Sequence, residues 1–104
     1  MFEEDFRKRI TELREQKKVS ARDMSLSIGQ NPSYIHFIET GKSMPSMSVF
    51  LFICDYLGIT PSEFFNTSVR KPERLRKVMS QLETLDSVTF DDIATMIDHL
   101  ATKK

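Results

Sequence analysis

The side chains that most often carry catalysis or bind metal are few and scattered in this chain. The 104 residues include one cysteine, Cys54, and two histidines, His36 and His99. None of the three has partner residues at the spacing of a zinc site or of a nucleophile and its base. No glycine-rich phosphate loop or dinucleotide turn is present either. The sequence therefore predicts a protein that is not an enzyme and has no metal or cofactor, and it predicts that Cys54 is a buried apolar residue.

Composition favours one small folded domain with a short appendage. Hydrophobic residues make up 39% of the chain and charged residues 29%, and the 15 Lys and Arg balance the 15 Asp and Glu. That balance lacks the basic excess of a strong nonspecific nucleic-acid binder. The basic residues in the first quarter of the chain, which include the run at 7–9, are interleaved with acidic residues, and such a pattern is typical of solvated helix faces. With no signal core, no apolar run of membrane length and no cysteine pair, we expect a cytoplasmic protein that has no membrane segment.

Apolar residues recur at helical spacing along the first two thirds of the chain, with almost no strand pattern. Ser20 and Thr60 are suited to cap helices, and Asn31 followed by Pro32 predicts a helix that begins at the proline. Glycines end three of the segments. The expected helices cover residues 3–17, 21–28, 32–40, 46–56 and 61–65.

The polar stretch NTSVRKP after Phe65 predicts a linker between a domain at 1–66 and an extension at 67–104. Two further helices are expected in the extension, the second from about Phe90. Their apolar stripes contain Leu75, Val78, Met79 and Leu82, and then Ile93, Ile97 and Leu100. A hairpin this small cannot bury both stripes alone, so they pack either on the first domain or on a second chain. We favour the second chain, which makes these residues the interface of a homodimer.

The helices expected at 21–28 and 32–40 are separated by a short turn and form a helix-turn-helix unit, whose second helix normally enters the major groove of DNA. The stretch from Phe6 to Phe65 resembles the Cro/C1, or XRE-type, family of phage and bacterial regulators. The residues that carry the resemblance are Gly29, the series Glu39, Gly41, Lys42, Pro45 and Ser46, and the ending LGITPSEFF. The resemblance implies an all-α, five-helix, lambda-repressor-like domain before the two-helix extension. It also implies a sequence-specific, repressor-like transcriptional regulator whose partner is double-stranded DNA, with no small-molecule ligand evident.

The same resemblance assigns a DNA-facing surface around the second helix of the unit. The base-facing positions are Pro32, Ser33, Tyr34, His36 and Phe37, and the phosphate-facing positions are Lys18, Ser20, Ala21, Asn31, Lys42 and Ser43. Backbone amides at the start of this helix are expected to bind phosphates as well. Ala21 stands where many members have a phosphate-bracing glutamine, and Ser25 stands where many have a small alanine. No arginine, glutamine or asparagine on the base-facing side offers a bidentate base contact.

Arg14 and Glu39 occupy positions where such domains commonly hold a partly buried ion pair. We expect that pair here in a structural role, and the alternative is two independent surface charges. A second function is also compatible with the sequence, because Tyr34 and Phe37 would equally suit contact with a protein. In that case the domain is a protein-interaction module, such as an antitoxin or accessory factor. Neutral net charge and Ala21 favour this alternative.

Overall fold

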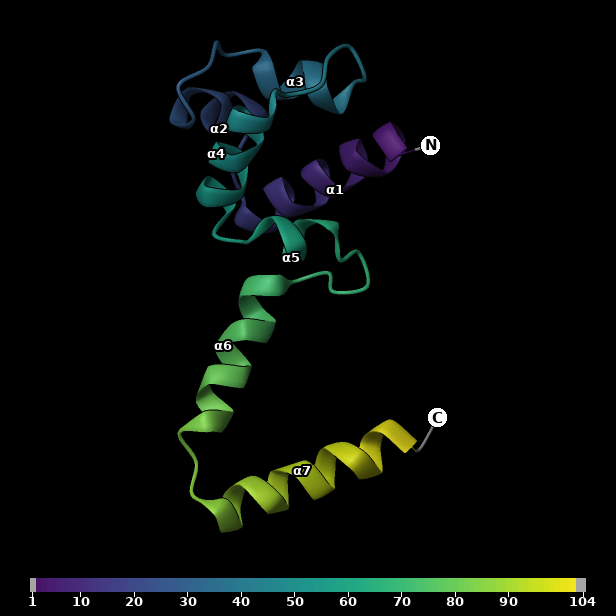
Figure 1. Cartoon of the computed structure of the whole chain (residues 1–104), viewed down its shortest axis with the longest axis vertical. Helices are drawn as coiled ribbons and strands as arrows, with labels where there is room; N and C mark the ends of the chain where they lie inside the picture. The colour runs from purple at the N-terminus through teal and green to yellow at the C-terminus, as the bar shows by residue number, and fades with distance from the viewer. Residues whose placement is uncertain (1, 103–104) are drawn as a thin grey trace. The chain divides into compact units, whose positions relative to one another are not determined.

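The computed structural model describes residues 2–102, and these residues form seven helices and no strand. The all-helical class predicted from the sequence is confirmed. Among the described residues, those up to Glu73 form one compact unit and those from Arg74 form a second. The helices are α1 (Phe2–Lys17), α2 (Ala21–Ser27), α3 (Tyr34–Glu39), α4 (Met47–Leu57), α5 (Pro61–Phe65), α6 (Pro72–Glu83) and α7 (Ser87–Thr102) (Figure 1).

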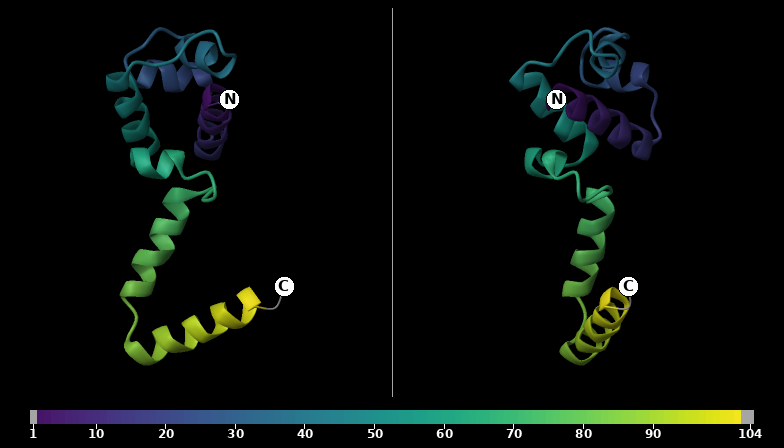
Figure 2. Two further views of the ribbon diagram at one scale, coloured as in Figure 1. Left: turned by 45° about the vertical axis from the view of Figure 1, so that its right-hand side comes forward. Right: turned by 90° about the vertical axis from the view of Figure 1, so that its right-hand side faces the viewer.

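The core of the first unit is built from one apolar face of each of α1 to α5. The rings of Phe6, Phe50 and Phe64 gather where α1, α4 and α5 meet, with centroids 5.0 to 5.7 Å apart. Figure 2 shows α4 running from the loop after α3 to α5, so this one helix connects the two ends of the unit. Met24 and Ile35 are fully buried where α2 and α3 pack together. The core thus fixes both helices of the helix-turn-helix against α1 and α4.

Caps set most helix ends where the sequence predicts them. Ser20 and Ser46 accept hydrogen bonds from the backbone amides three residues on, at 3.0 and 3.3 Å. Thr60 and Glu63 form a reciprocal capping box at the start of α5. Gly58 ends α4 with φ +72°, a left-handed conformation that costs glycine little.

The start of α3 differs from the prediction. The helix begins at Tyr34 and not at Pro32. The side-chain oxygen of Asn31 accepts from the Ser33 amide at 3.0 Å, and its carbonyl accepts from the Tyr34 amide at 3.1 Å. Asn31 therefore closes a local turn through residue 33 instead of capping a helix at Pro32.

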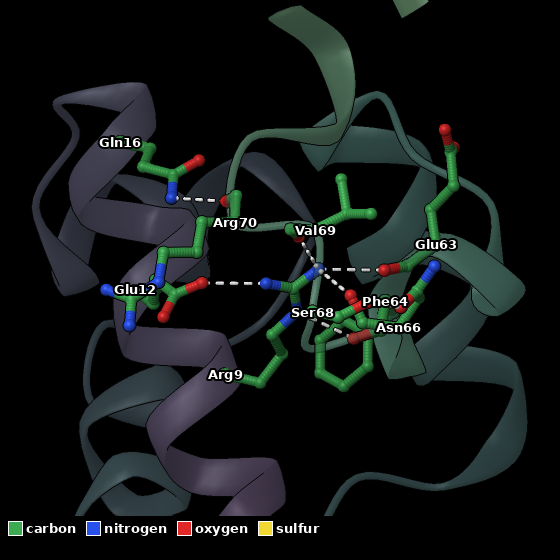
Figure 3. Close-up of polar contacts among 9 residues, drawn as sticks. All are labelled: Arg9, Glu12, Gln16, Glu63, Phe64, Asn66, Ser68, Val69 and Arg70. Carbon is green, nitrogen blue, oxygen red and sulfur yellow. Dashed lines mark hydrogen bonds and ion pairs between the residues drawn. The ribbon is translucent and has the colours of Figure 1, made fainter. Parts of the chain in front are cut away.

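The segment after α5 does not behave as the linker that its composition suggests, because Arg9 binds it to α1. Arg9 is only 3% exposed, although the sequence places it in a basic run typical of a solvated face. Its guanidinium donates to the carbonyls of Phe64 at 2.7 Å, Glu63 at 2.8 Å and Val69 at 2.9 Å (Figure 3). Those carbonyls lie at and beyond the end of α5, where backbone acceptors lack helical partners. The first unit consequently extends to residue 73, whereas the sequence places its boundary after residue 66.

In the second unit, α7 begins at Ser87, earlier than the expected Phe90. Asp86 caps it by accepting from the amide and the hydroxyl of Thr89, at 2.8 and 3.1 Å. These hydrogen bonds stabilise the carboxylate and lower the pKa of Asp86. Across the described part of the chain, none of the helices has both the length and the apolar character to span a membrane.

Candidate nucleic-acid interface

Ser25 holds α2 and α3 together at the centre of the helix-turn-helix. Its side chain is fully buried, and its hydroxyl donates to the Ala21 carbonyl at 2.7 Å while it accepts from the Ile35 amide at 3.0 Å. A serine at this position is therefore more than a slightly larger alanine, because it satisfies a buried amide in the first turn of α3. Sequence reasoning missed this role, which depends on two residues ten positions apart meeting across the turn.

The ion pair expected between Arg14 and Glu39 is present and holds the far end of α3. Arg14 Nε lies 2.7 Å from Glu39 Oε2 and Nη2 lies 3.1 Å from Oε1, and Nη1 donates to the Val19 carbonyl at 2.9 Å. Both side chains are mostly covered, at 16% and 13% exposure. The hydrogen bond to Glu39 is the main reason that the pKa of Arg14 is raised. The bidentate geometry connects α1 to the end of α3 and fixes the angle between them.

Four of the five predicted base-facing residues are exposed. Pro32 and Ser33 lie in the turn before α3, while His36 and Phe37 lie on the outer face of the helix. Tyr34 differs because it is half-buried and packs against the core, and this burial raises the pKa of its hydroxyl. The surface exposed to a partner therefore consists of the Ser33 hydroxyl, the His36 imidazole and the Phe37 ring, with Pro32 beside them.

Lys42 lies over the ring of Phe37. The Lys42 Nζ is 5.4 Å from the ring centroid, a distance at which the cation is attracted to the face of the ring. The amides of Lys42 and Ser43 both donate to the Phe37 carbonyl, at 2.8 and 3.3 Å, so these two residues can offer a phosphate only their side chains. The pair brings a positive charge beside the apolar part of the α3 surface.

The backbone amides expected to bind phosphate at the start of α3 already have partners. The amides of Ser33 and Tyr34 donate to Asn31, and the Ile35 amide donates to Ser25. The turn and the buried serine thus use three of the donors on which that expectation relies, so phosphate binding here depends mainly on side chains.

The remaining predicted phosphate-facing residues surround the start of α2 and the turn after it. Lys18 is exposed and adopts a left-handed backbone conformation, with φ +61°, between α1 and α2. Ser20 and Asn31 are exposed; Ser20 uses its side-chain oxygen to cap α2 and Asn31 uses its own in the turn before α3, which leaves the hydroxyl hydrogen and the amide group able to donate. Ala21 is half-buried against the core and has no polar side-chain atom to offer. Exposed cations around α2 and α3 include Lys18, Arg22 and Lys42.

Comparison with known proteins agrees with this geometry. A family model described as a helix-turn-helix domain matches residues 8–68, more than half of the 104 residues. No curated protein and no solved structure matches the chain. The matched range contains α2, the turn and α3 together with the helices that support them. The chain belongs to the helix-turn-helix domain family, within its XRE-like group, and this membership indicates a DNA-binding regulator.

Proposed function

We propose that this protein is a sequence-specific, repressor-like transcriptional regulator of the Cro/C1 type that acts in the cytoplasm as a homodimer. Its α1 to α5 constitute a lambda-repressor-like domain, and α3 enters the major groove of double-stranded DNA. The observation that carries the proposal is the anchoring of α3. Ser25 holds its first turn and Arg14 holds its last residue, while His36 and Phe37 remain exposed between them.

The chemistry of the exposed residues sets what this surface can recognise. The imidazole of His36 and the hydroxyl of Ser33 can hydrogen-bond a base edge, and the ring of Phe37 suits a thymine methyl group. Lys42 lies beside that ring and supplies a charge for the adjacent phosphate. With no bidentate base contact on this surface, we expect each half-site to be read weakly, and we expect DNA shape and a second reading helix to contribute the rest.

A dimer would supply that second helix, and the second unit has the surface for it. The apolar face of α6 contains Leu75, Val78, Met79 and Leu82, and that of α7 contains Ile93, Ile97 and Leu100. Leu82 and Ile93 are half-buried, and the other five are 45% to 60% exposed. In a dimer, once one α3 has bound its half-site, binding of the other α3 is intramolecular, and this raises the overall affinity without new contacts.

Selection of bound fragments from a pool of random DNA sequences tests the proposal. We expect an enriched palindrome whose half-sites are about one helical turn, roughly 34 Å, apart. Enrichment of a single half-site would support sequence-specific DNA binding but contradict the proposed dimer. A pool with no enrichment after repeated rounds would contradict sequence-specific binding.

The rival function is a protein-interaction module, such as an antitoxin or accessory factor, that uses the surface of α3. The occupied amides at the start of α3 and the absence of a polar group at Ala21 favour it, since both reduce phosphate binding. Both functions need Phe37 exposed, but only DNA reading needs Lys18 and Lys42. Replacing both lysines with uncharged residues should therefore weaken DNA binding but leave binding to a protein partner unchanged.

A further inference from the structure

Charge is distributed unevenly between the two helices that follow the helix-turn-helix unit. Residues 70–77 contain five Lys and Arg and one acidic residue, whereas residues 83–98 contain five acidic residues and no Lys or Arg. The chain as a whole is neutral, so this segregation does not reflect a general excess of either sign. The start of α6 is thus basic and α7 is acidic.

The charges lie on the polar sides of the two helices. Because successive helical residues point in directions about 100° apart, Arg74 on α6 and Asp92 on α7 flank the apolar faces, whereas Lys77 and Asp98 lie further round each helix. These four charged residues are all exposed. Each helix therefore combines an apolar face with a polar side of mainly one sign.

Neither apolar face is covered within the second unit. Leu75, Val78 and Met79 on α6 are 45% to 54% exposed, and Ile97 and Leu100 on α7 are 52% and 60% exposed. Burying apolar faces of this kind is favourable, and the charges on the two helices decide whether α6 meets α6, α7 meets α7 or α6 meets α7. Pairing α6 with a second α6 would bring basic segments together, and pairing α7 with α7 would bring aspartates together.

We propose that in the dimer α6 of one copy packs against α7 of the other, so that the basic α6 meets the acidic α7 at two symmetry-related contacts, with Arg74 and Asp92 at the margin of each contact. The inference rests on the proposed homodimer and specifies its pairing. In a two-fold dimer each copy gives one basic and one acidic face, so both contacts are complementary at once.

Two charge-reversed full-length chains test the pairing. The first carries R74E and K77E and makes α6 acidic; the second carries D92K and D98K and makes α7 basic. Each variant alone places like charges at both contacts, and we expect its dimer dissociation constant in dilute salt to rise roughly tenfold or more over that of the unaltered chain. An equimolar mixture restores opposite charges at both contacts, so we expect a heterodimer with nearly the original affinity.

The matched control has the same change in net charge but places it in the first unit. K8E with R22E alters two exposed cations of α1 and α2, and should leave dimerisation in sedimentation equilibrium unchanged. Mixed with the α7 variant, this control has opposite charges at only one of the two contacts, so we expect a heterodimer much weaker than that of the two charge-reversed variants. If the two heterodimers are equally tight, net charge alone drives the mixing and the proposal fails.

Each other result has a distinct meaning. An unaltered chain that stays monomeric at tens of micromolar overturns the dimer of the proposed function and the pairing with it. If R74E with K77E does not weaken the dimer, α6 does not pack on α7, although the chain still dimerises. Variants that are weakened singly but not restored by mixing indicate that the two helices pair within one chain, which also overturns the inference. Circular dichroism of each variant at matched concentration shows that its helices have formed.

Discussion

Replacing Ser25 with alanine should destabilise the helix-turn-helix, although alanine fits the position and is the better helix former. The hydroxyl accepts from the Ile35 amide at 3.0 Å, and the Ile35 side chain is fully buried beside it. A buried amide that loses its acceptor costs about 1 to 3 kcal/mol. The higher helix propensity of alanine offsets about 0.5 kcal/mol of this loss. We therefore expect a net loss of about 1 to 2 kcal/mol in the free energy of unfolding.

Urea denaturation followed by circular dichroism measures this loss. Ser27→Ala is the matched control, because Ser27 lies on the same helix but is exposed, and we expect it to change stability by less than about 0.5 kcal/mol. Hydrogen exchange adds a local test, since the Ile35 amide should exchange faster in Ser25→Ala than in the control. Equal stability and equal exchange in the two variants would show that Ser25 does not hold α3 in place.

Three further changes test other parts of the structure. Glu39→Ala leaves Arg14 mostly covered without its partner, and chemical denaturation should show a loss of about 2 to 3 kcal/mol, between the values typical of exposed and of buried pairs; a loss below about 1 kcal/mol would contradict a supporting role. Lys42→Ala should weaken DNA binding about equally on all sequences and lower the salt slope by about one unit, while an unchanged slope would place Lys42 away from phosphate. The pKa of Asp86 is lowered from 3.8, so its contribution to the start of α7 is fully present above that value and is lost as the pH falls through the folded pKa. Acidification should therefore reduce the helicity of the natural chain more than that of Asp86→Asn, and equal acid curves in circular dichroism would contradict this capping role.

Features that depend on residues close in sequence were predicted well. Ser20 and Thr60 cap the helices that they were expected to cap, because a cap needs only a hydroxyl and the amide three residues on. The apolar spacing of Phe6 and Ile10 likewise identified the buried face of α1. The pairing of Arg14 with Glu39 came from family resemblance, since spacing alone does not bring together residues 25 apart.

Features that depend on distant contacts were missed. Arg9 looks like one of several surface cations in the sequence, and only the fold brings its guanidinium to carbonyls 54 to 60 residues away. Ser25 and Asn31 illustrate the same point at shorter range. Their side chains accept from amides just before and within the first turn of α3, and this could not be inferred without the path of the turn. The result is a candidate site that offers a phosphate fewer donor groups than the sequence suggests.

The most direct measurement of the central claim is the ratio of affinities for the selected palindrome and for a shuffled duplex of the same composition. Fluorescence anisotropy at one fixed, physiological salt concentration gives both dissociation constants for the full chain. We predict that the palindrome binds at least about 100-fold more tightly, because several base pairs are read and each mismatch costs about 1 to 3 kcal/mol. Affinities within about twofold of each other would show that the surface of α3 does not read sequence, and would contradict the proposed function.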